Sequence, residues 1–347
     1  GGGVMTKEEM IRHKTSVNSR IKEVRKRMKP IKCPLCKRPL GKACNSHSVP
    51  RMILNTISKD GYLYNKNIVD NIDFTDSING INKTGTFQYI CRTCDNNFFA
   101  DYEQPEVIHT YPSDKMLVEI AIKNVLQKMQ AKAFESTFFK TDPLIIQSGL
   151  IANREDVIKI FELDYRDYEW YLNRFISIKE NDEANRFKII FRTVLNYEVP
   201  IATQECFTIY KDRNGNDINN PNLGDSERVQ VVHLCVFPFE GKTTVLLFYY
   251  CEDTSYDILK QQFENSSCDI NLRYINYYML ALGENYFYSG KIKEELFSNP
   301  SLKKISREYI GEKGNFGISS LKGGEYTAVK YDEIPFLLDK IYSLDNM

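Results

Sequence analysis

The sequence predicts an α+β protein with two parts, and three patterns in its 347 residues support this. Two Cys-x-x-Cys pairs lie within the first hundred residues. Apolar residues at helical spacing precede the first pair and follow the second pair. Alternating aromatic and β-branched runs fill the chain after about residue 140. We therefore expect a small zinc-bound N-terminal module and a larger C-terminal α+β domain with antiparallel strands.

The first predicted element is a basic amphipathic helical arm over residues 4–30. Thr6 and Glu9 have the spacing of a capping box, in which each residue satisfies a backbone N–H of the other. Apolar residues return every three or four positions from Val17 to Met28, as on one face of a helix. Pro30 should end the helix, because proline has no N–H to donate.

Charge is distributed unevenly along the chain. Residues 4–42 hold 13 Lys or Arg against three Glu, a net +10, whereas the whole chain is neutral and the remainder is therefore −10. A basic arm leading into a cysteine pair is typical of a surface that binds nucleic-acid phosphates, although a solvated helix face has the same pattern. The candidate phosphate-binding residues are Arg25, Lys26, Arg27, Lys29, Arg51 and Arg92.

The four paired cysteines predict a structural zinc site within residues 31–110. Cys33 and Cys36 form one pair, and Cys91 and Cys94 form the other. Each pair presents two thiolates from a tight turn, which is half of a tetrahedral zinc site. Nine cysteines, with no apolar leader or membrane-spanning run in the sequence, favour a cytoplasmic protein with reduced thiols and no membrane association.

The rest of the chain is assigned from its periodicity. A connecting helix is expected over residues 111–140, with its strongest signal from Ser113 to Glu135, and a long Asn- and Asp-rich loop over Asn65–Asn82. The C-terminal domain, residues 141–347, should contain strands at Phe187–Leu195, Glu205–Tyr210, Gln230–Phe237 and Thr243–Cys251, and helices at Ser255–Glu264 and Ile270–Leu282.

Two apparent motifs in that domain are interpreted as turns. Gly241-Lys242-Thr243 lacks the earlier glycine that a phosphate-binding loop needs, and it lies between two predicted strands. Asp212 to Asn216 has its glycine too early for a calcium loop. Neither segment is expected to bind a ligand.

The stretch CPLC…CNSHSVPRMIL…ICRTCDNNFF resembles the HNH endonucleases of the ββα-metal group. The resemblance covers residues 31 to 103 and implies a treble-clef zinc fold, in which a knuckle, a β-hairpin and a helix surround the metal. In this family a histidine at the end of the first strand activates water, and the helix supplies a ligand to a catalytic divalent ion.

The resemblance assigns roles to individual residues. It makes His47 the general base, with Pro50 at the usual distance after it. Asp95 falls where the family has its metal-binding histidine, and a carboxylate there suits Mg²⁺ or Mn²⁺. Two positions depart from the pattern: Ser46 stands where an aspartate ligand often precedes the base, and Thr86 stands where an asparagine usually braces the loop.

Each assignment has a simpler alternative. His47 could be structural, or it could complete a compact zinc site with Cys33, Cys36 and Cys44. Asp95 could be only a carboxylate favoured by the positive end of a helix dipole. The aromatic residues after it, Phe98, Phe99 and Tyr102, are expected in the core, and no role is assigned to the histidines at positions 13, 109 and 233.

These observations predict a metal-dependent endonuclease that hydrolyses phosphodiester bonds in a nucleic acid, with DNA the first expectation. The C-terminal domain shows no catalytic pattern, so we expect it to regulate or target the nuclease through an activating ligand or partner. A homodimer is expected because HNH enzymes commonly pair two sites to cut two strands. By analogy, the arrangement suits a restriction or phage-defence effector. The competing hypothesis is a non-catalytic zinc protein that binds nucleic acid or acts as a scaffold.

Overall fold

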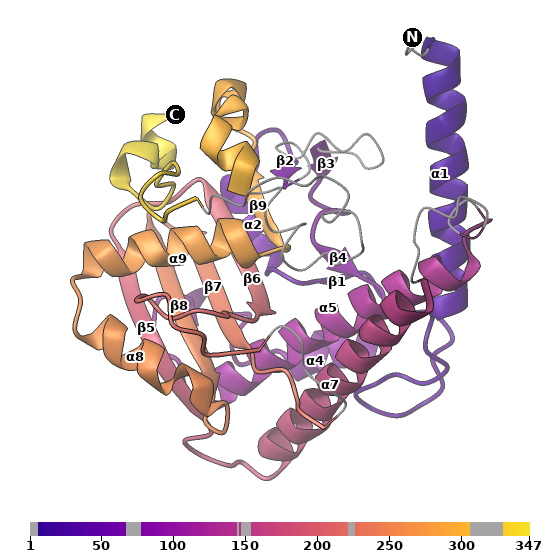
Figure 1. Ribbon diagram of the computed structural model, residues 1–347, viewed down its shortest axis with the longest axis horizontal. Helices are drawn as coiled ribbons and strands as arrows, with labels where there is room; N and C mark the ends of the chain where they lie inside the picture. Colours follow the sequence, from indigo (N-terminus) through magenta and orange to yellow (C-terminus); the bar gives the residue numbers. More distant parts are fainter. Residues whose placement is uncertain (1–5, 67–77, 144–145, 147–153, 221–225, 306–328) are drawn as a thin grey trace.

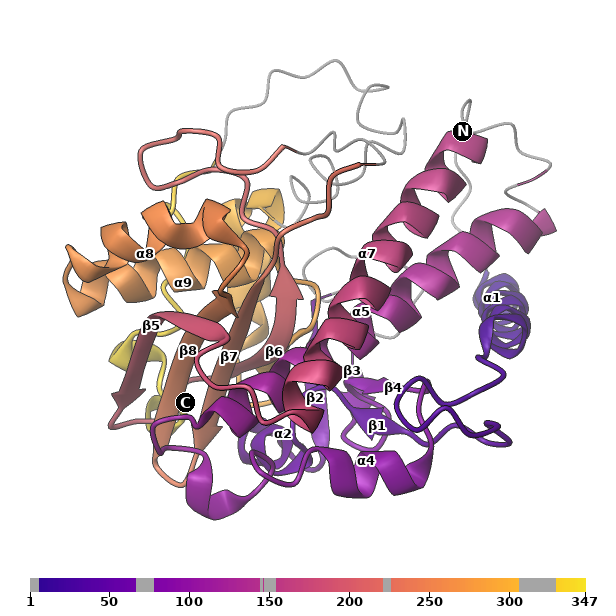
Figure 2. The ribbon, with the colours of Figure 1, turned by 90° about the horizontal axis from the view of Figure 1, so that it is seen from below.

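The computed structural model describes residues 6–66, 78–143, 146, 154–220, 226–305 and 329–347. Helices cover both faces of one large antiparallel sheet (Figures 1 and 2), so the predicted α+β class is confirmed. Among the described helices, none combines the length and the apolar surface of a bilayer-spanning segment.

The main helices and strands have the following bounds. The helices are α1 (Lys7–Met28), α2 (Arg51–Ile57), α4 (Arg92–Phe98), α5 (Asp114–Thr141), α7 (Arg154–Glu180), α8 (Asp257–Glu264) and α9 (Cys268–Leu282). The strands are β1 (Ser46–His47), β2 (Tyr62–Asn65), β3 (Ile78–Gly80), β4 (Thr86–Phe87), β5 (Phe187–Leu195), β6 (Ile201–Phe207), β7 (Val232–Phe239), β8 (Lys242–Tyr250) and β9 (Tyr286–Ser289).

The large sheet has seven strands in the order β3-β2-β9-β6-β7-β8-β5, and each neighbouring pair is antiparallel. The hairpin between β7 and β8 turns at Glu240 and Gly241, whose φ angles are 46° and 77°. Two successive positive φ angles are the requirement of a tight hairpin turn that matches the strand twist. Residues 241–243 therefore belong to a turn and the strand after it, as the sequence predicts.

The central strands are buried on both faces and divide the core in two. Leu234 and Val236 on β7 pack with α8 and α9, whereas Cys235 and Phe237 point to the opposite face. That second face packs against α2, α5 and α7, and its core continues into the cysteine-rich region. Alternate residues of one strand thus contribute to two different cores, as the period of a strand requires.

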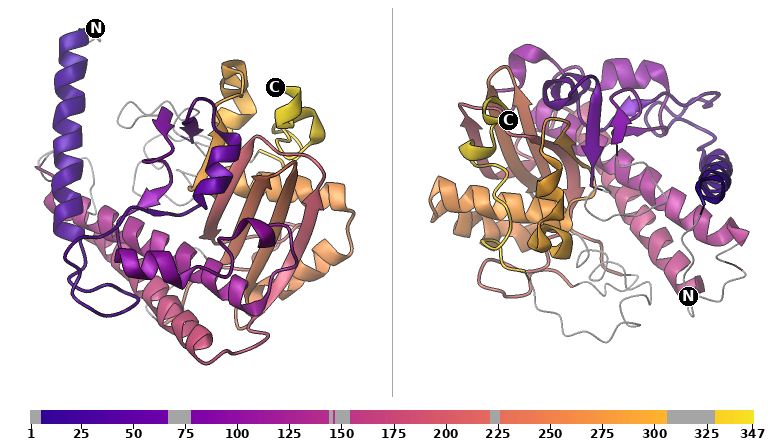
Figure 3. Two further views of the ribbon diagram at one scale, coloured as in Figure 1. Left: turned by 180° about the vertical axis from the view of Figure 1, so that it is seen from behind. Right: turned by 90° about the horizontal axis from the view of Figure 1, so that it is seen from above.

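Helix α1 begins with the capping box that the sequence predicts. The hydroxyl of Thr6 accepts a hydrogen bond from the backbone N–H of Glu9 at 3.2 Å, and the carboxylate of Glu9 accepts one from the N–H of Thr6 at 2.7 Å. Val17 and Val24 are buried, α1 packs against α5, and its N-terminal half projects beyond the rest of the described chain (Figures 1 and 3).

The cysteine-rich region is continuous with the large sheet. Strand β2 pairs with β9, so β2 and β3 extend the C-terminal sheet (Figure 3). Ser48 accepts a hydrogen bond of 2.7 Å from the side-chain amide of Asn285. The pairing of strands more than 200 residues apart joins the two regions in one core.

Several elements differ from their predicted bounds. Helix α7 and strand β9 were not predicted, and β6 begins at Ile201 instead of Glu205. The predicted loop Asn65–Asn82 contains strand β3, while its residues 67–77 lie outside the described residues. In β9 the reason is its length, because four residues are too few to establish a period.

Candidate metal centre and active site

The first cysteine pair lies in a tight turn closed by its own backbone. The N–H of Cys33 donates to the carbonyl of Arg38 at 2.9 Å, and the N–H of Lys37 donates back to the carbonyl of Cys33 at 2.9 Å. Lys37 adopts a positive φ of 60°, which lets the chain reverse directly after Cys36. The turn therefore holds both thiols on the same side.

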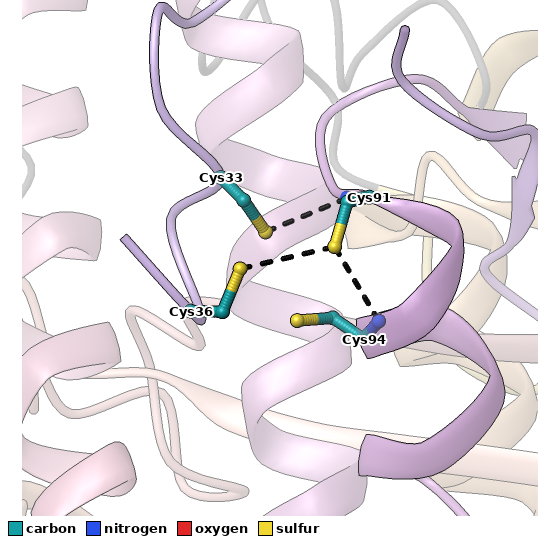
Figure 4. A group of neighbouring side chains, drawn as sticks. All are labelled: Cys33, Cys36, Cys91 and Cys94. Carbon is teal, nitrogen blue, oxygen red and sulfur yellow. Dashed lines mark hydrogen bonds between the residues drawn. The ribbon is translucent and has the colours of Figure 1, made fainter. Parts of the chain in front are cut away.

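The second pair is at the start of α4. Cys91 is the N-cap residue, and its sulfur accepts a hydrogen bond from the N–H of Cys94 at 3.5 Å. The helix thus fixes Cys94 one turn from Cys91, as Figure 4 shows.

The four sulfur atoms converge in one cluster that could hold a metal ion such as zinc. They all lie within 4.8 Å of one another, and the sulfurs of Cys36 and Cys91 are 3.8 Å apart (Figure 4). A tetrahedral site with zinc–sulfur bonds of about 2.3 Å would place its sulfurs about 3.8 Å apart. The backbone N–H of Arg38 lowers the pKa of Cys36 to about 7, which favours the thiolate that a metal binds, whereas burial raises the pKa of Cys33 and of Cys94.

Neither Cys44 nor His47 belongs to this cluster, although Cys44 is close in the chain. The N–H of Cys44 donates to the carbonyl of Ile90 at 3.0 Å, and burial raises the pKa of its thiol to about 12. In the described chain, therefore, the four paired cysteines form the metal cluster, and the compact Cys₃His alternative is not what the structure contains.

His47 is half-buried, and it has one hydrogen bond to the backbone. Its Nε2 lies 3.2 Å from the carbonyl oxygen of Ile81. A carbonyl can only accept, so Nε2 carries the proton and Nδ1 is left with a lone pair. Among the described residues Nδ1 has no hydrogen-bond partner. Burial lowers the pKa of His47, as do the charges of Lys123 and Arg51, so the ring is neutral at pH 7.

Asp95 lies in the first turn of α4 and contacts the residue that precedes His47. The hydroxyl of Ser46 donates a hydrogen bond to Oδ1 of Asp95. The ammonium of Lys123, a residue of α5, lies 3.8 Å from the same oxygen. Ser46 and Asp95, the two positions where the HNH family has metal ligands, are therefore in direct contact.

Lys123 and Glu103 are site residues that the sequence analysis missed. Lys123 is only 2% exposed, its ammonium donates to the carboxylate of Glu103, and it lies 4.3 Å from the centre of the Phe99 ring. Phe99 and Tyr102 are buried in the core as predicted, whereas Phe98 is only partly buried against it. The signal in the sequence was Lys123 itself, a charged residue among the apolar residues of α5. A lysine buried in this way requires an anionic partner.

The residues at Asp95 do not fit a catalytic Mg²⁺ or Mn²⁺. Such ions need several oxygen ligands in near-octahedral arrangement, but Asp95 contacts one hydroxyl and one buried ammonium. In the described chain the four-cysteine cluster is the one group of His, Cys, Asp or Glu ligand atoms that could hold a metal. The divalent ion expected from the family resemblance therefore has no preformed site here.

The predicted phosphate-binding residues are at the surface. Arg25, Lys26, Arg27 and Lys29 are exposed on or directly after α1, and Arg51 and Arg92 are exposed at the starts of α2 and α4. Arg27 pairs with Glu23 at 2.9 Å, and Lys29 donates to the carbonyl of Gly41. Arg51 is close enough to His47 for its charge to lower the histidine's pKa.

The other described histidines have structural surroundings. Both ring nitrogens of His109 are 2.8 Å from partners, the hydroxyl of Thr244 and the carbonyl of Phe239. His233 is fully buried against Phe248, and burial lowers its pKa to about 3. Neither histidine has a hydrogen bond or ion pair to Asp95.

Comparisons with protein-family models, with curated proteins and with solved structures find no match to this chain. The likeness to HNH endonucleases therefore rests on the sequence motif alone.

Proposed function

We propose that this chain is an HNH-like phosphodiesterase that acts on nucleic acid, with DNA the first expectation, and that His47 is its general base. One observation carries the proposal: Nε2 of His47 is bound to the carbonyl of Ile81, while Nδ1 has no hydrogen-bond partner among the described residues. A general base needs a neutral ring in a fixed orientation with an open lone pair. His109 differs because both of its nitrogens have partners, and His233 differs because its unpaired Nε2 is fully buried, whereas the ring of His47 is only half-buried.

In the proposed reaction Nδ1 of His47 removes a proton from water as the water oxygen bonds to phosphorus. The phosphorus–oxygen bond to the leaving group then breaks, and that oxygen takes a proton from solvent. Arg51 is exposed beside His47, so its guanidinium is available to the phosphate. A zinc ion held by the four cysteines would order the turn at Cys33 and the start of α4, and with them the contact between Ser46 and Asp95.

The direct test is cleavage of plasmid DNA and of labelled single-stranded DNA and RNA by the purified full chain. We expect nicked or shortened products, and the choice among substrates identifies the nucleic acid. No product from any substrate, in a sample with one zinc per chain, would contradict the proposal.

We predict that the acid limb of the pH–rate profile lies below pH 6.5. Only the neutral form of His47 can accept a proton, and burial, Lys123 and Arg51 lower its pKa, against opposing effects of Ile81 and Asp95. Activity should therefore persist as pH falls through 6.5 and be lost at a more acidic value. Replacing Arg51 by glutamine should move this limb to higher pH. If the acid limb of the Arg51→Gln variant moved to lower pH instead, the assignment of this limb to His47 beside Arg51 would be wrong.

We also predict that the exposed basic residues of α1 bind nucleic-acid phosphates. The variant with Arg25, Lys26 and Lys29 changed to alanine should bind DNA more weakly. Its affinity should also depend less on salt, by about one unit of log–log slope for each lost contact. Fluorescence anisotropy over a salt series measures both, with Lys242→Ala as a control at an exposed position on β8. An unchanged salt slope would assign binding to another surface.

One observation favours the second candidate, a zinc-dependent nucleic-acid-binding protein without activity. Ser46 and Lys123 both contact Oδ1 of Asp95, the oxygen that a metal ion would otherwise bind. Such contacts are expected where a metal site has been lost. This candidate predicts DNA binding that depends on α1 together with no cleavage by the unaltered chain.

A further inference from the structure

The cation position of the candidate site is filled by a side chain. The ammonium of Lys123 lies between two carboxylates, those of Asp95 and Glu103. Asp95 comes from the first turn of α4, Glu103 follows that helix, and Lys123 is on α5, so three segments converge on one charge. The face of the Phe99 ring lies 4.3 Å from the same ammonium and adds a favourable cation–π contact.

Lys123 is not a surface lysine that a metal could displace easily. Its side chain is 2% exposed, whereas those of Asp95 and Glu103 are 21% and 28% exposed. The ammonium therefore lies on the protein side of the two carboxylates, which are closer to solvent. A hydrated divalent cation that approached Asp95 would meet this fixed positive charge directly behind the carboxylate.

We propose that Lys123 replaces the divalent ion of this site, so that Asp95 and Glu103 hold an internal ammonium instead of Mg²⁺ or Mn²⁺. The inference has two consequences. That Asp95 binds no divalent ion follows from geometry alone, whereas hydrolysis without an added divalent ion rests also on the proposed function. Lys123 is a positioning residue: it balances Asp95, which in turn accepts the hydrogen bond of Ser46 next to His47. Hydrolysis then proceeds without an added divalent ion.

The metal-binding consequence is tested without any activity measurement. Zinc-loaded protein is titrated with Mn²⁺ and followed by calorimetry or by electron paramagnetic resonance. The unaltered chain should show no Asp95-dependent binding. Lys123→Met, which keeps the length of the side chain and removes its charge, should bind Mn²⁺ at least about tenfold more tightly, because two carboxylates then face a neutral site.

Two further variants make this measurement decisive. The double variant Lys123→Met/Asp95→Asn should lose the gained binding, and Lys123→Arg should resemble the unaltered chain. Thermal unfolding establishes that each variant is folded. Asp95-dependent Mn²⁺ binding by the unaltered chain would overturn the inference, as would a folded Lys123→Met variant that gains none.

The catalytic consequence separates this inference from the proposed function. Cleavage is measured in buffers stripped of divalent ions, with the zinc content determined before and after. Cleavage without added Mg²⁺ or Mn²⁺ supports both ideas. Cleavage that requires added Mg²⁺ or Mn²⁺ would overturn the proposal that Lys123 replaces the divalent ion. It would leave the proposal that His47 is the general base intact. Absence of cleavage in both conditions counts against the proposed function, and the Mn²⁺ titration then decides the inference.

Discussion

Replacing His47 by alanine is expected to reduce cleavage by about 10²- to 10⁴-fold, the range that a general base contributes. The reason is that Nδ1 keeps a lone pair with no partner among the described residues, near the charge of Arg51, while Nε2 is held by the carbonyl of Ile81. The variant should retain its zinc and its affinity for DNA, because His47 does not belong to the four-cysteine cluster and its hydrogen bond goes to Ile81.

A matched variant separates chemistry from packing. His47→Gln keeps a side-chain donor for the carbonyl of Ile81 but has no base, so it should be about as inactive as His47→Ala while melting closer to the unaltered chain. Added imidazole should restore part of the activity of His47→Ala. Cleavage by His47→Gln at the rate of the unaltered chain would remove His47 from the mechanism.

The second large effect is expected from the zinc site. Changing Cys94 to serine should lower the zinc content from one ion per chain to near zero and destabilise the cysteine-rich region. Structural zinc contributes about 10–16 kcal/mol to the folding of small zinc fingers. The loss here should amount to several kcal/mol, because the region also shares a core with α5. Elemental analysis and thermal unfolding with and without a chelator measure both quantities.

Cys44→Ser is the matched control for this prediction. Cys44 is a neighbouring half-buried thiol that does not belong to the cluster, so its variant should keep one zinc and unfold near the temperature of the unaltered chain. Loss of zinc from Cys44→Ser, or retention of zinc by Cys94→Ser, would reassign the ligands.

Features that depend on neighbouring residues could be predicted from the sequence. The capping box of α1 spans Thr6 to Glu9, and the turn at Glu240 and Gly241 joins adjacent strands. The two cysteine pairs likewise form locally, one in a tight turn and one at the start of α4, and their convergence followed from the known geometry of zinc sites. Such features are encoded within a few positions, so periodicity and turn chemistry suffice to detect them.

The candidate site was only partly predictable for the same reason. His47 and Asp95 were found through a motif, but the partners that determine their chemistry lie elsewhere: Ile81 is 34 residues from His47, and Lys123 comes from α5. In the sequence, Lys123 is one charged position in a helical pattern and nothing relates it to Asp95. The expectation of a divalent ion followed from the motif, and the packing of α5 against α4 puts an ammonium at that position.

The sequence by itself therefore determined the α+β class, the four-cysteine cluster, the basic arm and the central hairpin, all of which arise from local spacing. Only the tertiary structure decided that β2 pairs with β9, that one core joins the two regions, and that Lys123 lies between Asp95 and Glu103. These contacts form between segments distant in the chain, where burial and charge pairing choose the partners after the local elements exist.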